Sequence, residues 1–219
     1  LSRTRRRRKR IRSQVRRLTP GWEQILNCLK ADYDKIFKNE IITDLIKVIG
    51  CGVEVKTGKN KEISMFNLDN LRWNKIVICT DADVDGFHIR TLILTMLYRL
   101  VPTLIEKGYV YIAESPLFEI TTSDKIYFAY DENEKTKILK MIGNKKFDIQ
   151  RSKGLGENEA EMMSLTTMDP ATRRLIKIEP DDIEQTQWMF DMLLGDDLQG
   201  RKDFITNNGV DYLDMADIS

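Results

Sequence analysis

The feature that most constrains the fold is the stretch of residues 75–113. A short run of mostly β-branched residues, KIVIC at 75–79, is typical of a strand buried on both faces of a parallel sheet. The acidic segment TDADVDG follows at 80–86, and then a strongly apolar helix that Gly108 should end. YVYIA at 109–113 predicts a second strand. The stretch therefore predicts a βαβ unit, in which ligands bind at the carboxyl ends of the strands.

The other segments predict a mixed α/β protein. Apolar residues at three- and four-residue steps predict helices, and alternating segments predict a hairpin and a further strand. Pro102 should kink the long apolar helix. Together with the βαβ unit, these segments predict the α/β fold class, with a parallel sheet flanked by helices. The expected helices are 32–49, 132–142, 160–165, 184–194 and 201–207, the hairpin is 117–121 with 125–130, and the further strand is 174–178.

The charges of the chain are unevenly distributed. The formal net charge is only +1, from 35 Lys and Arg against 34 Asp and Glu. Residues 1–20 hold ten basic side chains and no acidic one. A block of like charge cannot collapse on itself, so residues 1–24 are expected to be a basic, disordered segment. Such an arm would bind nucleic acid nonspecifically with steep salt dependence.

The composition excludes several classes of protein. No apolar run approaches the ~18 residues of a membrane span, and the amino-terminal residues lack the apolar region of a secretory signal. Cys28, Cys51 and Cys79 form no CxxC pair. They fit reduced thiols in a cytoplasmic protein better than a disulfide scaffold or a zinc site. We therefore expect a cytoplasmic protein without a membrane partner.

The acidic segment is the candidate for chemistry. Asp81, Asp83 and Asp85 alternate, and on an extended backbone they would share one side, where a cation would relieve their repulsion. Carboxylate oxygens at the mouth of a sheet suit Mg²⁺, which binds one or two carboxylates together with substrate phosphates. The pattern favours metal-assisted phosphoryl transfer on nucleic acid.

Three other interpretations of the acidic segment compete with this one, and the sequence argues against the first two. An EF-hand would need a glutamate at its twelfth position, where this chain has Leu92, and a helix before the loop. An aspartate-nucleophile phosphatase would have Thr or Val two positions after its D-x-D pair, where this chain has Asp85, and residues 181–182 are the only candidate acidic pair. The simplest interpretation is an acidic turn that caps the following helix.

Several long motifs resemble one family. KIVICTDADVDGFHIRTLILTMLYRLVPTLIEKGYVYIAESPLFEI resembles the TOPRIM domain in the B subunit of bacterial type IIA DNA topoisomerases, that is, DNA gyrase or topoisomerase IV. KGLGE at 153–157 and TTMDPATRRLIKI at 166–178 are similar to the tail of the same subunit, in the same order. The resemblance implies an α/β fold: an incomplete Rossmann-like TOPRIM domain, with a parallel sheet flanked by helices, followed by a small α+β tail. It begins at about Ile25, which gives expected divisions of 1–24, 25–123 for a truncated TOPRIM domain and 124–219 for the tail.

The resemblance implies an enzyme subunit, part of an ATP-hydrolysing DNA topoisomerase. Asp81 and Asp83 would be the catalytic metal ligands, Asp85 a supporting carboxylate, and an upstream glutamate of an EGDSA motif the remaining ligand. The metal would be Mg²⁺, with Mn²⁺ or Ca²⁺ as possible substitutes. The partners would be DNA and the A subunit, which supplies the nucleophilic tyrosine in an A2B2 heterotetramer. ATP would bind only in an amino-terminal domain that this sequence does not contain.

The resemblance also implies contacts with DNA. Two cationic side chains follow the acidic segment, one asparagine matches a GKILN segment, and KGLGE combines a lysine with glycines that permit close backbone approach. The expected DNA-binding residues are Asn27, His88, Arg90, Lys153, Gly154 and Gly156.

The chain departs from the family at its amino-terminal end. The EGDSAGG motif is absent, and GWEQILNCLK stands where the family has LRGKILN. The hypothesis that follows is that residues 1 to about 24 come from a shifted reading frame or a foreign junction. On that view the metal site lacks one ligand. The alternative function, a non-catalytic module that binds DNA and the A subunit, therefore stays open.

Overall fold

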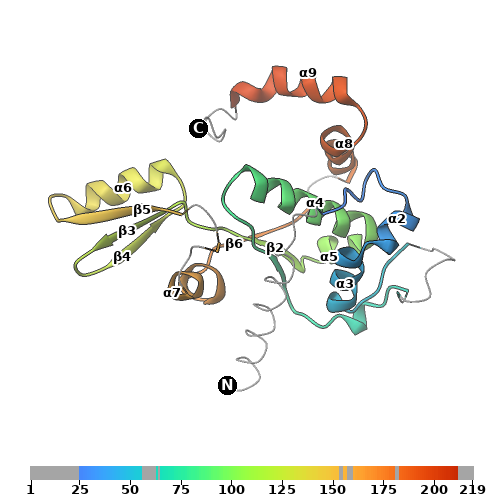
Figure 1. Ribbon diagram of the computed structural model, residues 1–219, viewed down its shortest axis with the longest axis horizontal. Helices are drawn as coiled ribbons and strands as arrows, with labels where there is room; N and C mark the ends of the chain where they lie inside the picture. The colour runs from blue at the N-terminus through green and yellow to red at the C-terminus, as the bar shows by residue number, and fades with distance from the viewer. Residues whose placement is uncertain are drawn as a thin grey trace.

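The fold is described from a computed structural model, which covers residues 25–55, 63, 65–152, 155–156, 160–180 and 183–211 (Figure 1). Four features singled out in the sequence lie outside these residues: the basic segment 1–24, Lys153, Gly154 and the acidic pair 181–182. The polar residues 57–60, which predict a loop, lie outside them as well.

The central sheet confirms the predicted βαβ unit. β1 (Ile76–Ile78) leads into α4 (Val84–Leu100), and β2 (Val110–Ala113) returns parallel to β1. A third strand, β6 (Leu175–Lys177), pairs with β2 on its other side, in the order β1-β2-β6. β6 is antiparallel, which the expectation of a parallel sheet did not include. β6 lies in the region expected to be the tail, 124–219. The expected TOPRIM domain and the expected tail therefore contribute strands to the same sheet.

Pro102 divides the long apolar helix into two. α4 ends at Leu100, and α5 (Pro102–Glu106) begins with the proline at its first position. Val101 between them has φ −149° and ψ 55°, since a residue before proline is disfavoured in the helical region. The prediction of a break at this point is confirmed.

The two amino-terminal helices share a hydrophobic core with the first sheet. α2 (Tyr33–Lys38) and α3 (Glu40–Ile49) are capped by Asp32 and Asn39, whose side chains accept backbone N–H groups of the first turn. Gly50 ends α3 with φ 92°. The core of this part consists of side chains from α2 to α5, β1 and β2, chiefly Ile36, Ile42, Ile46, Leu97, Leu100, Leu104 and Val110.

A second three-stranded sheet extends to one side of the first (Figure 1). β3 (Phe118–Thr122) and β4 (Ile126–Ala129) form the predicted hairpin, and α6 (Glu132–Ile142) packs against β4. β5 (Phe147–Arg151) completes the antiparallel order β4-β3-β5 and was not predicted. The expected division at residue 123 falls in the turn between β3 and β4.

The remaining elements are short helices. η1 (Leu68–Asn70) precedes β1, and α7 (Ala160–Met163) continues into a π-helical turn, η2 (Ser164–Met168). α8 (Ile183–Leu194) and α9 (Leu198–Asn208) form a hairpin, with Phe190 of α8 stacked on Tyr98 of α4 at 4.9 Å between ring centroids. None of the helices in the described ranges is long and apolar enough to cross a membrane.

Candidate metal centre

Asp83 lies at the carboxyl end of β1 and caps α4. Its Oδ1 accepts the backbone N–H of Gly86 at 2.7 Å, and its main-chain carbonyl accepts the N–H of Phe87 at 2.9 Å. The simplest sequence interpretation, helix capping, therefore describes one role of this carboxylate. A cap bond occupies one carboxylate oxygen, and the other can still bind a cation.

Asp81 contacts the distant tail. Its Oδ1 accepts the backbone N–H of Leu155 at 2.6 Å, although the two residues are 74 positions apart in the sequence. Leu155 belongs to the KGLGE segment, so the structure brings the two resemblance-bearing motifs together. The sequence showed both motifs but not this contact, which depends on the tertiary fold.

Asp85 is placed differently from the expectation. The extended backbone ends at Asp83, and Asp85 is an exposed residue in the first turn of α4. The expectation that all three aspartates alternate on an extended run is wrong, because capping by Asp83 starts the helix at Val84. Across the described residues, no three His, Cys, Asp or Glu side chains form a cluster that could hold a metal.

Gly86 is required by the close packing of this turn. A Cβ atom at this position would lie 2.1 Å from the main-chain oxygen of Asp81. A Cβ atom and a non-bonded oxygen cannot approach so closely, so any other residue would displace the backbone of the turn. The glycine therefore holds Asp81 and the start of α4 together.

The donor groups of the turn fit a hard divalent cation. Asp81 and Asp83 are both partly buried, and each uses Oδ1 for a backbone N–H. Mg²⁺ is commonly bound by one or two carboxylates and completes its shell with water and substrate phosphate oxygens. Two carboxylates at the mouth of β1 match that requirement, although they form only part of a full ligand set.

The predicted DNA-binding residues near the turn differ in their surroundings. His88 is exposed on α4. Arg90 lies 4.7 Å over the ring of Phe87, and its Nε is buried without a hydrogen-bond partner within the described part of the chain. Burial lowers the pKa of Arg90, whereas Cys79 and Glu114 raise it. Gly156 is exposed, and a Cβ there would meet no described atom within 4 Å.

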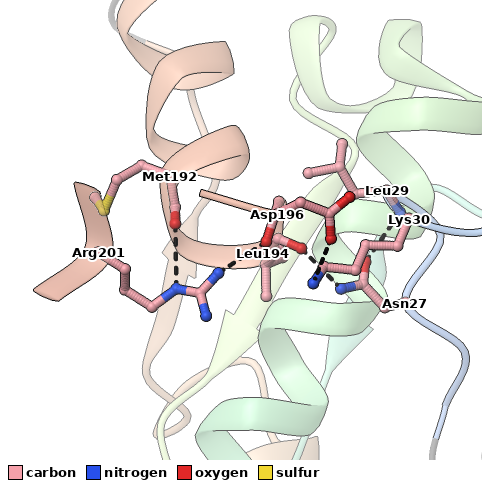
Figure 2. A network of polar contacts seen from close by, with 8 residues as sticks. Asn27, Leu29, Lys30, Met192, Leu194, Asp196 and Arg201 are labelled. Atoms are coloured by element: carbon pink, nitrogen blue, oxygen red, sulfur yellow. Dashed lines mark hydrogen bonds and ion pairs between the residues drawn. The ribbon is translucent and has the colours of Figure 1, made fainter. Parts of the chain in front are cut away.

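Asn27 lies in a different environment, against the end of α8 (Figure 2). Its Nδ2 donates to the carbonyl of Leu194 at 3.1 Å, and its Oδ1 accepts the N–H of Leu29 at 3.0 Å. Lys30 pairs with Asp196 at 2.8 Å. The loop that carries Asn27 therefore holds the α8–α9 hairpin, which sequence reasoning did not predict.

Arg99 fixes the same loop to the last turn of α4. Its Nη1 donates to the carbonyls of Cys28, Leu29 (3.1 Å) and Ala31 (2.7 Å), and its guanidinium lies 4.6 Å over the ring of Tyr33. α4 has 17 residues, so about 25 Å separate its two ends. Asn27 thus lies near the opposite end of α4 from Asp81 and Asp83, and the structure does not bring these three together.

Because of Cys28, the free energy of unfolding should decrease as the pH rises in the alkaline range. Burial raises the pKa of its thiol to about 11, although nearby Arg99 lowers it. A thiol with a raised pKa in the folded state stabilises the fold below its unfolded pKa, and this contribution is lost as the pH rises through about 11. Urea unfolding at pH 8 and pH 10 should show a larger loss of stability for the wild type than for Cys28→Ala. Equal losses in the two proteins would contradict this prediction.

Comparisons with known proteins agree with the geometry. Residues 20–115 match the family model described as the Toprim domain, and residues 144–206 match that of the DNA gyrase B subunit, carboxyl terminus. The chain is a relative of the DNA gyrase B subunit. The gyrase B subunit of Treponema denticola is 38% identical over 199 residues, which cover 90% of this chain and 30% of the relative.

Other gyrase B subunits are similarly related. That of Mycoplasmoides gallisepticum is 43% identical over 84% of this chain and 27% of its own length. That of Thermotoga maritima is 39% identical over 85% of this chain and 28% of its own length. The chain therefore spans about three tenths of the curated gyrase B subunits that it matches.

These matches confirm the resemblance and the fold class. The chain contains a Toprim domain followed by a gyrase B carboxyl-terminal region, and a Toprim domain in this context implies use of a divalent metal ion. They favour the topoisomerase interpretation over the EF-hand and phosphatase alternatives. A strand, β1, also precedes the acidic turn, where an EF-hand would have a helix.

Proposed function

We propose that this chain supplies the Mg²⁺-binding half-site in the B subunit of a type II DNA topoisomerase, which takes part in DNA cleavage and religation. The observation that carries the proposal is the turn after β1, where Asp83 caps α4 and Asp81 accepts the N–H of Leu155 from the gyrase B carboxyl-terminal region. In the whole enzyme this part would dock onto the A subunit and DNA within an A2B2 assembly in the cytoplasm. ATP would act in a different domain.

Asp81 and Asp83 would hold the metal ion, and Asp85 would add negative charge from the first turn of α4. Mg²⁺ would be the physiological ion, with Mn²⁺ or Ca²⁺ as substitutes. When bound, such an ion stabilises the attacking and leaving oxygens of a phosphodiester. The chain's own contribution is to hold the two carboxylates in place through the α4 cap and the Leu155 amide.

His88 is the best placed of the proposed DNA contacts, because it is exposed two residues beyond the acidic segment. We retain Arg90, Lys153, Gly154 and Gly156 as further DNA contacts, of which Lys153 and Gly154 lie outside the described residues. Asn27 would contact DNA only at a separate point, since its amide binds Leu194 near the other end of α4.

A second candidate is a binding module that docks onto the A subunit and DNA without supporting cleavage. The observation that favours it is that the described residues provide two carboxylates and no third group for a metal cluster. A site with part of its ligands binds its metal more weakly.

A plasmid assay separates the two candidates. Supercoiled plasmid would be incubated with this chain, a gyrase A subunit and Mg²⁺, and linear product would be measured. We expect linear product that requires Mg²⁺, disappears with Asp81→Asn and persists with Asp44→Ala, an exposed aspartate of α3. Absence of linear product, together with measurable binding of the A subunit, would contradict the half-site and support the module.

A further inference from the structure

β5 is an edge strand that is exposed along its whole length. It lies at one end of the order β4-β3-β5, and all five of its residues are exposed. Phe147 and Ile149 expose 45% and 38% of their surface to solvent. At the opposite edge of the same sheet, β4 is partly buried and α6 packs against it. β5 is therefore the more accessible of the two edges.

The outer edge of β5 presents main-chain groups for hydrogen bonding. The N–H of Ser152 donates to the carbonyl of Leu117 at 2.9 Å, which extends the ladder between β5 and β3. Alternate residues of an antiparallel strand direct their main-chain groups to opposite sides. Since Ser152 faces β3, the N–H and C=O groups of Phe147, Ile149 and Arg151 point outward, where no strand of the described residues pairs with them.

β5 lacks the features that usually protect an edge strand. Soluble proteins protect such edges with prolines, bulges or very short strands. The segment FDIQR has no proline, and its five residues pair with β3 in unbroken register. An edge of this kind is a template for the addition of another strand.

The sequence of β5 is complementary to itself in the antiparallel direction. If two copies pair about Ile149, Phe147 of one copy lies opposite Arg151 of the other, where a guanidinium can lie over the ring. Asp148 lies opposite Gln150, whose amide can donate to the carboxylate. The outward N–H and C=O groups of Ile149 would bond reciprocally to those of the second Ile149. The same surface of both copies is used, as a two-fold interface requires.

We propose that the edge of β5 binds the same edge of a second copy of this chain, which joins the two three-stranded sheets into one sheet about a two-fold axis. The self-complementarity of the five residues selects a second copy over an unrelated strand. The contact is small beside the ~1,200 Å² of a stable interface, so we expect a reversible dimer that forms at high protein concentration. The proposal does not depend on the proposed metal site or function, and its test uses neither DNA nor Mg²⁺.

Disulfide cross-linking of the full chain tests the register. Ile149→Cys should give a cross-linked dimer under mild oxidation, because opposite residues of a hydrogen-bonded pair have Cα atoms about 5.5 Å apart, within reach of a disulfide. Gln150→Cys is the matched control, because its two copies would lie diagonally across, beyond that reach, and should not cross-link. A mixture of Phe147→Cys and Arg151→Cys should cross-link, whereas either variant alone should not. The wild-type chain measures any background from Cys28, Cys51 and Cys79.

Sedimentation velocity over a range of concentrations tests reversible association. The sedimentation coefficient of the wild-type chain should rise with concentration, and Ile149→Lys should abolish the rise by placing two like charges opposite each other. Ile126→Lys, at an isoleucine of β4 with a similar exposed fraction of 43%, should associate like the wild type. Asp148→Asn should shift association to lower concentration, since the two Asp148 carboxylates would lie diagonally across the two-fold axis and repel each other.

A chain that stays monomeric at every concentration, or equal cross-linking of Ile149→Cys and Gln150→Cys, would overturn the proposal. Association that persists in Ile149→Lys and is lost in Ile126→Lys would place the interface at β4 and would overturn it too. Circular dichroism checks that each variant is folded. If Ile149→Lys does not fold, the cross-linking pattern alone decides.

Discussion

Gly86→Ala should lower the free energy of unfolding by about 3 kcal/mol and should disrupt the metal centre. The added Cβ would lie 2.1 Å from the main-chain oxygen of Asp81, so the backbone of the turn has to move. That movement should break the hydrogen bond between Leu155 and Asp81 and separate the two carboxylates. Urea unfolding and Mn²⁺ binding measure the two effects.

Gly86→Ala is informative because packing and helix propensity predict opposite changes in the free energy of unfolding. Alanine at a helical position is ordinarily favoured over glycine by about 1 kcal/mol, so propensity alone predicts stabilisation of α4. Gly156→Ala is the control, because a Cβ at Gly156 meets nothing within 4 Å of the described atoms, and its stability should change by no more than about 0.5 kcal/mol. A stabilised Gly86→Ala protein would show that the turn is not packed as described.

Arg99→Met should be the second severe substitution, lowering the free energy of unfolding by about 3 kcal/mol. Methionine preserves much of the buried stem but removes the donors to the carbonyls of Cys28, Leu29 and Ala31. It also removes the cation over the ring of Tyr33. Urea unfolding measures the loss, and Arg151→Met on the exposed strand β5 serves as the control.

Arg99→Met should also loosen the α8–α9 hairpin, because the loop fixed by Arg99 carries the Asn27 amide that binds Leu194. Hydrogen exchange along α8 should become faster, whereas exchange along α6, which packs against β4 of the other sheet, should not change. Unchanged exchange in α8 would mean that the hairpin is held by its other contacts, such as the stacking of Phe190 on Tyr98. Arg99→Lys should recover only part of the stability, since one ammonium group cannot reproduce the planar guanidinium.

Local signals in the sequence predicted most of the elements. The β-branched run indicated β1, the helical spacing indicated the α2–α3 pair and α6, and the proline indicated the break between α4 and α5. Each of these depends on residues within a few positions of one another. β5 was missed because FDIQR is exposed along its whole length and pairs with β3, which lies 25 or more residues earlier.

Long-range contacts could not be predicted from spacing. Leu155 and Asp81 are separated by 74 positions, and Asn27 and Leu194 by 167, so no periodicity connects them. The antiparallel direction of β6 could not be predicted for the same reason. β6 pairs with β2 only after the chain has formed the second sheet and α6. The aspartate pattern indicated a metal site, but only the structure showed that Asp83 starts a helix and that Asp85 belongs to it.

Calorimetric titration of the full chain with Mg²⁺ tests most directly whether Asp81 and Asp83 form a metal centre. Asn is the appropriate replacement, because Asp83→Asn keeps a good helix cap and Asp81→Asn keeps an acceptor for Leu155. We expect Mg²⁺ binding to be lost in both variants and retained in Asp44→Ala, with all proteins folded. Unchanged Mg²⁺ binding in both Asp81→Asn and Asp83→Asn would contradict the assignment of this site.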